Sequence, residues 1–193
     1  MKVTGLSAGL LSCIIAVTTV AAEKPENTSA QTNLDLYASP AEAWELLQKD
    51  RSAIRVDVRD PIEVMFTGFA TPTRIHVPLM LADPKSWNDS QGSWGMVKNP
   101  GFEAQLTEKL GQIGAGKDTN ILMMCRSGSC RAYAVNLLAA RGYHNLWSVV
   151  NGFEGVALKA GNSKGVRAVN GWWNSGLPRS YSVDSAVAWH PSD

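Results

Sequence analysis

The sequence predicts an α/β protein with a parallel β-sheet, because segments typical of strands alternate with segments typical of helices. β-Branched and apolar residues mark the strands. These are expected at residues 53–58, 74–77, 121–124 and 147–150. Helix signals fill the intervals between them. Such an alternation places the helices on the faces of the sheet and the strand ends at a shared edge.

The first two helices are predicted from their start signals. These are Ser39-Pro40-Ala41-Glu42 and Asp60-Pro61-Ile62-Glu63. In each segment the first residue can cap the helix, the proline suits the first turn, and the glutamate can close a capping box. The expected strand 53–58 lies between them, and the expected strand 74–77 follows the second helix and ends at Pro78.

The next stretch, residues 83–101, is rich in Asn, Ser, Gly and Pro and is expected to be a long irregular loop. It carries Trp87 and Trp94, which we expect to pack on the surface or to line a pocket mouth or a partner surface. A helix over residues 102–113 follows from apolar residues at near-helical spacing, and a last helix is expected over residues 132–141.

The composition of the chain excludes several classes of protein. Lys and Arg total 18 against 17 Asp and Glu, so the chain lacks the positive charge of a protein that binds nucleic acid through its phosphates. Hydrophobic residues make up 45% of the chain, which excludes a disordered protein. The length of 193 residues fits one domain with short extensions, and three cysteines are too few for a disulfide scaffold.

The first residues are typical of a secretory signal peptide, assigned to residues 1–22. Lys2 precedes an uncharged apolar run, and Val20-Ala21-Ala22 offers small residues for cleavage after Ala22. An uncleaved membrane anchor is the alternative, because a run of this length can span a bilayer. We therefore expect a periplasmic protein, with a polar, flexible leader at residues 23–37. Cleavage would leave Cys125 and Cys130 in an oxidising compartment.

The strongest candidate site is Cys125, which follows the buried strand 121–124 and precedes a short loop with Gly128 and then a helix. In open α/β sheets, ligands bind at the carboxyl ends of the strands. Loop N–H groups and the helix N-terminus favour the thiolate form of Cys125, and Arg126 and Arg131 add positive charge. The alternative is a buried, inert cysteine at the end of a strand.

Around this site the chain resembles the rhodanese (sulfurtransferase) family over about residues 38–178. We therefore expect a rhodanese-like domain at residues 38–180 and a C-terminal tail at 181–193. The segments that carry the resemblance are Asp57-Val58-Arg59-Asp60-Pro61, Gly68–Pro78, Cys125-Arg126-Ser127-Gly128, Arg141-Gly142-Tyr143, Val149–Gly155, Asn170-Gly171-Trp172 and Gly176-Leu177-Pro178. Each motif is weak alone, but the set in this order is specific. The resemblance implies a five-stranded parallel sheet flanked by helices.

The resemblance also implies a reaction. The Cys125 thiolate would take the sulfane sulfur of a donor such as thiosulfate, and a thiol or cyanide would then accept it from the persulfide. The backbone N–H groups of the loop would hold the persulfide; the loop residues are Arg126, Ser127, Gly128, Ser129, Cys130 and Arg131. No cofactor and no metal are expected, and the histidines His76, His144 and His190 are scattered. We expect a monomer that meets small-molecule substrates and a periplasmic protein partner.

Two alternatives for the activity stay open. Cys125 to Arg131 also reads as C-x5-R, the pattern of phosphatases and arsenate reductases, although Met124 stands where protein phosphatases usually have His. A sulfur carrier without turnover, or a non-catalytic binding module, is the other alternative. Asp57 is expected to accept hydrogen bonds from loop N–H groups, and Arg59 to be an ion-pair partner rather than a substrate ligand.

Cys130 stands at the position where many rhodaneses have Arg, and three roles are open for it. It can be a small residue that packs the first helical turn. It can attack a Cys125 persulfide, forming a disulfide and releasing sulfide. It can also pair reversibly with Cys125 as a redox switch, provided that the two β-carbons approach to about 4 Å.

Overall fold

A central parallel sheet organises the chain, which a computed structural model describes over residues 22–191. The predicted signal peptide therefore lies almost wholly outside the described residues. The sheet has the order β1-β8-β7-β2-β4, and every neighbouring pair is parallel. Its strands are β1 (Tyr37–Ala38), β2 (Ile54–Asp57), β4 (Thr73–His76), β7 (Ile121–Met124) and β8 (Leu146–Val149). The predicted five-stranded parallel sheet is thus confirmed.

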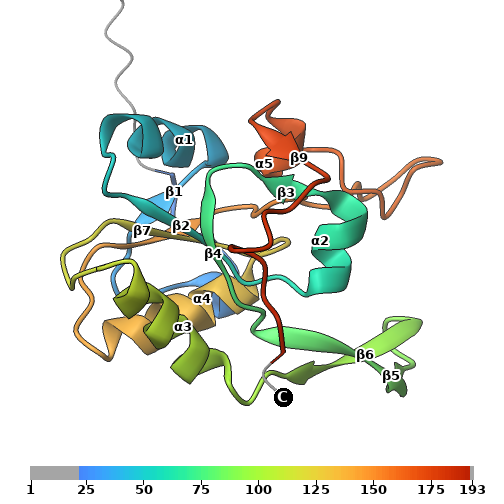
Figure 1. Ribbon diagram of the computed structural model, residues 1–193. Coiled ribbons are helices and arrows are strands. Elements are labelled where there is room, and N and C mark those ends of the chain that lie inside the picture. Colours follow the sequence, from blue (N-terminus) through green and yellow to red (C-terminus); the bar gives the residue numbers. More distant parts are fainter. Residues whose placement is uncertain (1–21, 192–193) are drawn as a thin grey trace, which may run out of the picture.

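Helices cover both faces of this sheet (Figure 1). On one face lie α1 (Pro40–Lys49) and the short α5 (Gly171–Asn174), and on the other lie α3 (Phe102–Gln112) and α4 (Ser129–Ala139). Helix α2 (Pro61–Thr67) follows β2, and a 3-10 turn, η1 (Thr28–Ala30), precedes β1. Both predicted capping boxes are present, at Ser39 with Glu42 and at Asp60 with Glu63. Helix α4 begins three residues before the predicted start.

Strand β7 shows how the two faces are divided. Ile121 and Met123 belong to the core under α3 and α4, whereas Leu122 and Met124 belong to the core under α1 and α5. Successive side chains of a strand point to opposite faces, and burial of all four explains the continuous apolar run in the sequence. By the same alternation the next residue, Cys125, lies with the core on the α3 and α4 face.

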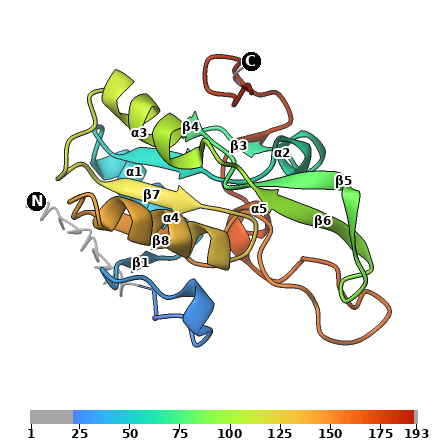
Figure 2. The same cartoon turned by 90° about the horizontal axis from the view of Figure 1, so that it is seen from below.

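The segment at residues 83–101 is not an irregular loop, and that prediction is wrong. It forms most of an antiparallel hairpin of β5 (Met80–Asn88) and β6 (Ser93–Lys98), which projects from the body in both views (Figures 1 and 2). Trp87 and Trp94 face each other across the two strands, with their rings 5.9 Å apart. Such cross-strand aromatic pairs stabilise a hairpin that has no core beneath it.

The two ends of the described chain pack on the domain. Residues 23–37, expected to form a flexible leader, contain η1 and Tyr37 of β1. The backbone N–H of Asn33 donates a hydrogen bond to Asn136 Oδ1 of α4 over 2.8 Å. At the other end, Trp189 donates its indole N–H to Gln105 of α3 and its backbone N–H to His76. Burial lowers the pKa of His76, which fits an imidazole that accepts a hydrogen bond from Trp189.

Two further short strands, β3 (Phe69–Ala70) and β9 (Arg179–Ser180), pair antiparallel beside α5. In the part of the chain that the structure describes, no helix is long and apolar enough to cross a membrane.

Candidate active site

Cys125 lies where the sequence placed it, at the carboxyl end of β7, which runs between β8 and β2 in the sheet. The loop of residues 126–128 turns back over the sulfur, and the N–H of Gly128 points at the Cys125 Sγ, 3.1 Å away. The side chain is 4% exposed. The site therefore holds a largely buried sulfur that faces a backbone donor and the start of α4.

The turn after β8 fixes this loop from one side. Phe153 N–H donates to the Cys125 carbonyl over 2.8 Å, and Glu154 N–H donates to the Arg126 carbonyl over 3.1 Å. Gly152 makes this approach feasible: its φ is +58°, and a β-carbon there would lie 2.3 Å from the Cys125 carbonyl oxygen. No other residue type fits this backbone.

Asp57 and Arg59 form a buried ion pair at the end of the neighbouring strand β2. The Arg59 Nη2 lies 2.7 Å from an Asp57 carboxylate oxygen, and both side chains are fully buried. Burial alone would raise the pKa of Asp57, but the charge and hydrogen bonds of Arg59 hold it below its ordinary value. Arg59 is thus an ion-pair partner, as expected. The N–H that Asp57 accepts belongs to Arg59, not to the Cys125 loop.

Arg59 also reaches across to the elements that flank the site. It donates to Thr67 Oγ1 over 2.9 Å and to the Gly68 carbonyl over 3.0 Å at the end of α2. Its guanidinium lies 3.9 Å from the centre of the Phe153 ring, in the turn that holds the Cys125 loop. The pair therefore supports the geometry of the site from below, and both side chains are closed off from solvent.

The mouth of the site carries charged side chains from separate parts of the chain. Arg126 is exposed and lies 3.6 Å from the carboxylate of Glu63 on α2. Burial raises the pKa of Glu63, although Arg126 acts against that shift. Arg167 donates to the Gly155 carbonyl over 2.5 Å, and burial, followed by the positive charge of Arg126, lowers its pKa.

Arg167 was missed by the sequence analysis. It lies in residues 156–169, between the segments Val149–Gly155 and Asn170-Gly171-Trp172, and no periodicity or motif within this stretch distinguishes it. Hydrogen bonds from Arg167 to the Gly155 carbonyl and from the Val156 N–H to Asn170 Oδ1 bring the two ends of this stretch together, beside the turn that holds the Cys125 loop. A hollow of about 220 Å³ lies next to it, lined by Thr67, Glu154, Val166, Arg167 and Trp173.

The remaining predicted loop residues divide into exposed and buried ones. Ser127 and Gly128 are half-buried, and Ser129 is exposed at the first position of α4. Cys130 is half-buried and packs against the core under α4. Arg131, in contrast, is 1% exposed, and its Nε donates to Ser148 Oγ of β8 over 2.6 Å. The structure therefore gathers the predicted loop around Cys125 but turns Arg131 inward.

Cys125 and Cys130 are both free thiols in the structure. Burial, followed by the charge of Cys125, raises the pKa of Cys130 to about 11. Cys130 is therefore a protonated thiol at neutral pH and a weak nucleophile. Among the residues that the structure describes, no three His, Cys, Asp or Glu side chains are grouped so that they could hold a metal ion.

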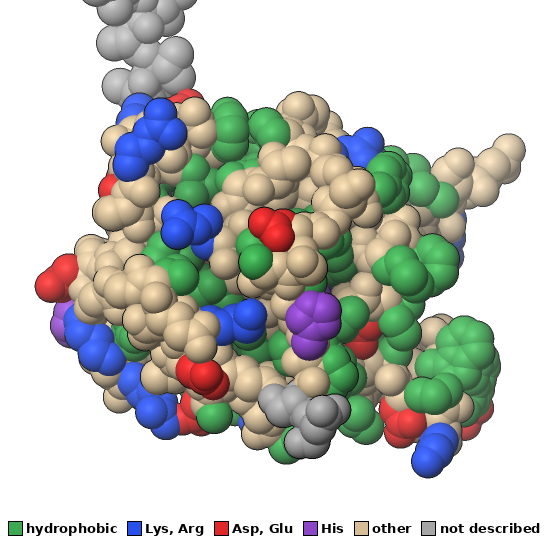
Figure 3. All heavy atoms as spheres, in the orientation of Figure 1, with side chains coloured by type: hydrophobic (Ala, Val, Ile, Leu, Met, Phe, Trp, Pro, Cys, Tyr) green, Lys and Arg blue, Asp and Glu red, His purple; other side chains and the backbone are tan. Residues whose placement is uncertain are grey.

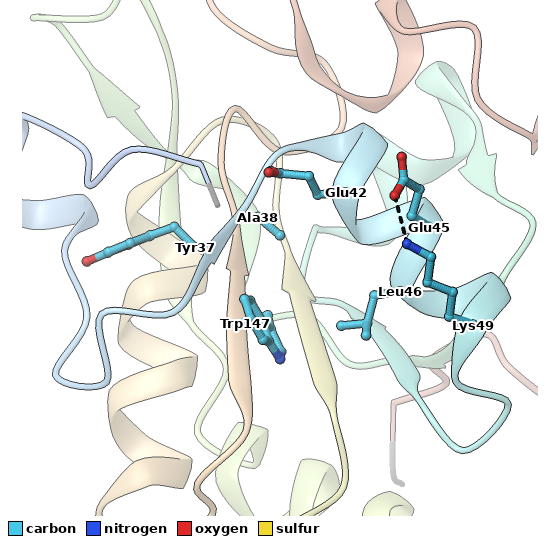
Figure 4. A pocket seen from close by; sticks show the side chains of 7 residues that line it. All are labelled: Tyr37, Ala38, Glu42, Glu45, Leu46, Lys49 and Trp147. Atoms are coloured by element: carbon cyan, nitrogen blue, oxygen red, sulfur yellow. Dashed lines mark hydrogen bonds and ion pairs between the residues drawn. The ribbon is translucent and has the colours of Figure 1, made fainter. Parts of the chain in front are cut away.

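A separate hollow lies on the far side of β8, between α1 and the sheet edge (Figure 4). Its volume is about 190 Å³, and its lining includes Leu46, Trp147, Glu42 and the ion pair of Lys49 with Glu45. None of its lining residues belongs to the Cys125 loop. This hollow is thus not part of the candidate site.

Comparison with known proteins gives the fold a wider context. The model of the rhodanese-like domain family matches residues 39–159. The crystal structure of Rv0390 from M. tuberculosis is similar, with a TM-score of 0.56, 26% sequence identity, and coverage of 76% of this chain and 99% of that one. No curated protein sequence matches the chain significantly.

Two further solved structures show weaker similarity. A rhodanese-related protein from Thermoplasma volcanium has a TM-score of 0.43 at 19% identity, covering 76% of this chain and 99% of that one. The polysulfide-sulfur transferase homodimer from Wolinella succinogenes has a TM-score of 0.46 at 19% identity, covering 75% of this chain and 77% of that one.

Proposed function

Because the chain belongs to the rhodanese-like domain family, we propose that it is a sulfurtransferase that moves a sulfane sulfur through a persulfide on Cys125. The observation that carries the proposal is the placement of Cys125: a buried sulfur at the end of β7, 3.1 Å from the N–H of Gly128. A backbone donor aimed at a sulfur stabilises negative charge on it, and both the thiolate and the persulfide carry that charge.

With thiosulfate as the donor, the reaction has two steps. The Cys125 thiolate attacks the outer sulfur of thiosulfate, the sulfur–sulfur bond of the donor breaks, and sulfite leaves with the bonding electron pair. Cys125 then carries a persulfide anion. Cyanide or a thiolate attacks the terminal sulfur, the new sulfur–sulfur bond breaks, and the Cys125 thiolate is restored. No proton, metal or external oxidant enters this balance.

The charges at the mouth favour an anionic donor. Arg126 directly follows Cys125 and is only loosely paired with Glu63, over 3.6 Å, and Arg167 is held to the Gly155 carbonyl in the turn that fixes the Cys125 loop. A dianion such as thiosulfate would gain from both guanidinium groups while its outer sulfur approaches Cys125.

Oxyanion chemistry of the C-x5-R type is less well supported. That chemistry needs the arginine to face the bound oxyanion, whereas Arg131 is 1% exposed and is held by Ser148 of β8. The guanidinium is thus directed under the loop. A phosphate or arsenate that entered from the mouth would meet Arg126 instead.

A sulfur carrier that serves a partner protein is the second candidate. The β5–β6 hairpin favours it, because Trp87 and Trp94 are 58% and 61% exposed and apolar side chains gather on the projecting hairpin (Figure 3).

We also propose that the protein is exported to the periplasm, on the basis of its N-terminal sequence. N-terminal sequencing of the native protein should begin at Glu23, and a chain that retains Met1 in the cytoplasm would contradict export.

The decisive test compares the two free cysteines. After incubation of the reduced protein with thiosulfate, the intact mass should rise by one sulfur atom, and thiocyanate should form when cyanide is added. Cys125→Ser should abolish both signals while the fold is retained, whereas Cys130→Ser should keep both. Sulfur transfer that survives in Cys125→Ser would overturn the proposal. A persulfide without thiocyanate formation would favour the carrier.

A further inference from the structure

Exposed apolar side chains concentrate on one side of the molecule. Most of the large apolar side chains that are exposed within residues 22–191 lie on three elements, which are helix α2, the β5–β6 hairpin and residues 156–169. Phe66 of α2 is 71% exposed, for example, and Val166 is 53% exposed. Single exposed apolar residues are ordinary, but a concentration of them on one side of a protein marks an interaction surface.

The three elements border the Cys125 loop because of the sheet topology. Helix α2 follows β2, the hairpin follows β4 and residues 156–169 follow β8, so all of them leave the parallel sheet at the edge where Cys125 follows β7. The Ala82 N–H at the base of the hairpin donates to the Asp60 carboxylate at the start of α2 over 2.6 Å. At the other end of α2, Thr67 lines one hollow together with Val166. The hairpin and residues 156–169 project from the same side of the body (Figures 1 and 2).

One face of the hairpin is directed toward the helix that follows the Cys125 loop. Trp94, Met96 and Lys98 alternate along β6 and therefore share this face. Lys98 donates a hydrogen bond to the Tyr133 hydroxyl of α4, and its ammonium lies 4.3 Å from the centre of the Tyr133 ring. Tyr133 stands one turn after Ser129, where α4 begins, and both residues are exposed. The apolar face of the hairpin thus continues onto the first turns of α4.

The surface around these apolar side chains is positively charged. Residues 156–169 contain Lys159, Lys164 and Arg167 and no acidic residue. Lys159 and Lys164 are exposed and form no ion pair within the described part of the chain. Arg126 of the Cys125 loop is held only loosely by Glu63. A complementary partner is therefore both apolar and acidic.

Two other occupants fit this surface less well. A second copy of the chain would bring the same positive charges against it, and like charges across an interface disfavour association. A lipid surface would be met first by the turn of the hairpin, which is polar at residues 89–92 and includes the carboxylate of Asp89. Segments that enter a bilayer interface place aromatic and basic side chains there. A protein segment fits better, since it can lie against the side of the hairpin.

We propose that the docking surface, formed by α2, the hairpin face with Trp87 and Trp94, and residues 156–169, binds an acidic, apolar segment of a partner protein that presents a cysteine to Cys125. This proposal rests on the sulfur transfer proposed above. The partner thiolate attacks the terminal sulfur of the Cys125 persulfide, the sulfur–sulfur bond breaks, the Cys125 thiolate is restored and the partner carries the persulfide. The two exposed indole rings supply the large apolar contact that dominates binding at many protein interfaces.

The test uses two fluorescent peptides as probes. Both have the same apolar residues around a central serine, which prevents any covalent step, but the remaining positions are aspartate and glutamate in one and lysine in the other. Fluorescence anisotropy with the reduced wild-type protein measures the affinities. The acidic peptide should bind at least about tenfold more tightly than the lysine peptide, and its affinity should fall as NaCl is raised. This comparison needs no variant.

Substitutions in the hairpin test its part of the docking surface. Trp87→Ala/Trp94→Ala should weaken binding of the acidic peptide by about tenfold, because it removes both large apolar contacts. Trp87→Phe/Trp94→Phe keeps two aromatic rings and should retain most of the affinity.

Charge reversals test residues 156–169. Lys159→Glu/Lys164→Glu should weaken binding of the acidic peptide by about tenfold and remove its advantage over the lysine peptide. The matched control is Arg51→Glu/Lys117→Glu, which reverses two exposed cations that precede β2 and β7, at the opposite edge of the sheet. This control should change the affinity less than about twofold.

Several results would contradict the docking surface. Equal binding of the two peptides, or an unchanged affinity in both the alanine and the charge-reversal double variants, would reject it. A wild-type dimer that dissociates in Trp87→Ala/Trp94→Ala would assign the surface to a second copy, and binding to phosphatidylglycerol vesicles that the same variant loses would assign it to lipid. Selective peptide binding without sulfur uptake by Cys125 would reject only the proposed function. Thiocyanate formation without selective peptide binding would reject only the docking surface.

Discussion

The Cys125 loop and the β5–β6 hairpin show two ways in which this chain builds a surface feature. The loop is held by partners that are distant in sequence, with Phe153 and Glu154 donating to its carbonyls and Arg131 reaching Ser148. The hairpin is held mainly by its own cross-strand pairs, among them Trp87 with Trp94. A change near the loop should therefore affect the chemistry and the stability together, whereas a change at the hairpin tip should affect neither.

The largest effect is expected where the loop meets the turn after β8. Gly152→Ala places a β-carbon 2.3 Å from the Cys125 carbonyl, at a φ of +58° that L-residues rarely adopt. We expect a loss of at least about 3 kcal/mol in the free energy of unfolding and loss of sulfur transfer. Denaturant unfolding and thiocyanate formation measure the two. Gly92→Ala in the hairpin turn, also at positive φ but with nothing near its β-carbon, is the control and should cost far less.

The next effect concerns the ion pair under the site. Asp57→Asn leaves Arg59 buried without its counter-ion, so we expect a loss of about 3–5 kcal/mol in the free energy of unfolding. Because the pKa of Asp57 is lower in the folded protein, its stabilisation is present above the unfolded pKa and is lost as pH falls through the folded value. Thermal unfolding between pH 7 and pH 3 measures this. If Asp57→Asn unfolds with the wild-type free energy at pH 7, the Asp57–Arg59 ion pair does not stabilise the fold.

Substitution of Cys130 tests whether a loop residue other than Cys125 is needed for sulfur transfer. Cys130→Ser should transfer sulfur within about twofold of the wild type, because a thiol whose pKa is raised to about 11 stays protonated at pH 7. Mild oxidant should inactivate the wild type reversibly, with loss of both thiols, and this reversible phase should be absent in the variant. If the oxidised wild type keeps both thiols, Cys130 serves only to pack α4.

The smallest effect is expected at the hairpin. The double variant Trp87→Ala/Trp94→Ala removes two exposed rings, and we expect less than about 1 kcal/mol change in stability and less than about twofold change in thiocyanate formation. Steady-state rates with thiosulfate and cyanide check this. A large loss with these small substrates would mean that the hairpin contributes to the site and that the two regions are coupled.

Much of the fold was predictable because its signals are local. The capping boxes at Ser39 and Asp60, the apolar strand before Cys125 and the order of the rhodanese-like motifs all depend on neighbours in sequence. The hairpin at residues 80–98 was not predictable as such. Its strands carry Pro84 and many polar residues, and they are defined by pairing with each other across a turn rather than by alternating burial.

The sequence by itself determined the α/β fold, the parallel sheet and the position of Cys125 at the end of a strand, because periodicity and caps record local geometry. Only the tertiary structure decided what surrounds the sulfur. It turned Arg131 inward to Ser148, brought Arg167 to the mouth, and placed Ala30 against the loop. Each of these contacts joins segments far apart in the chain, and the direction of a side chain within a helical turn depends on what packs against it. No pattern of neighbouring residues encodes that packing.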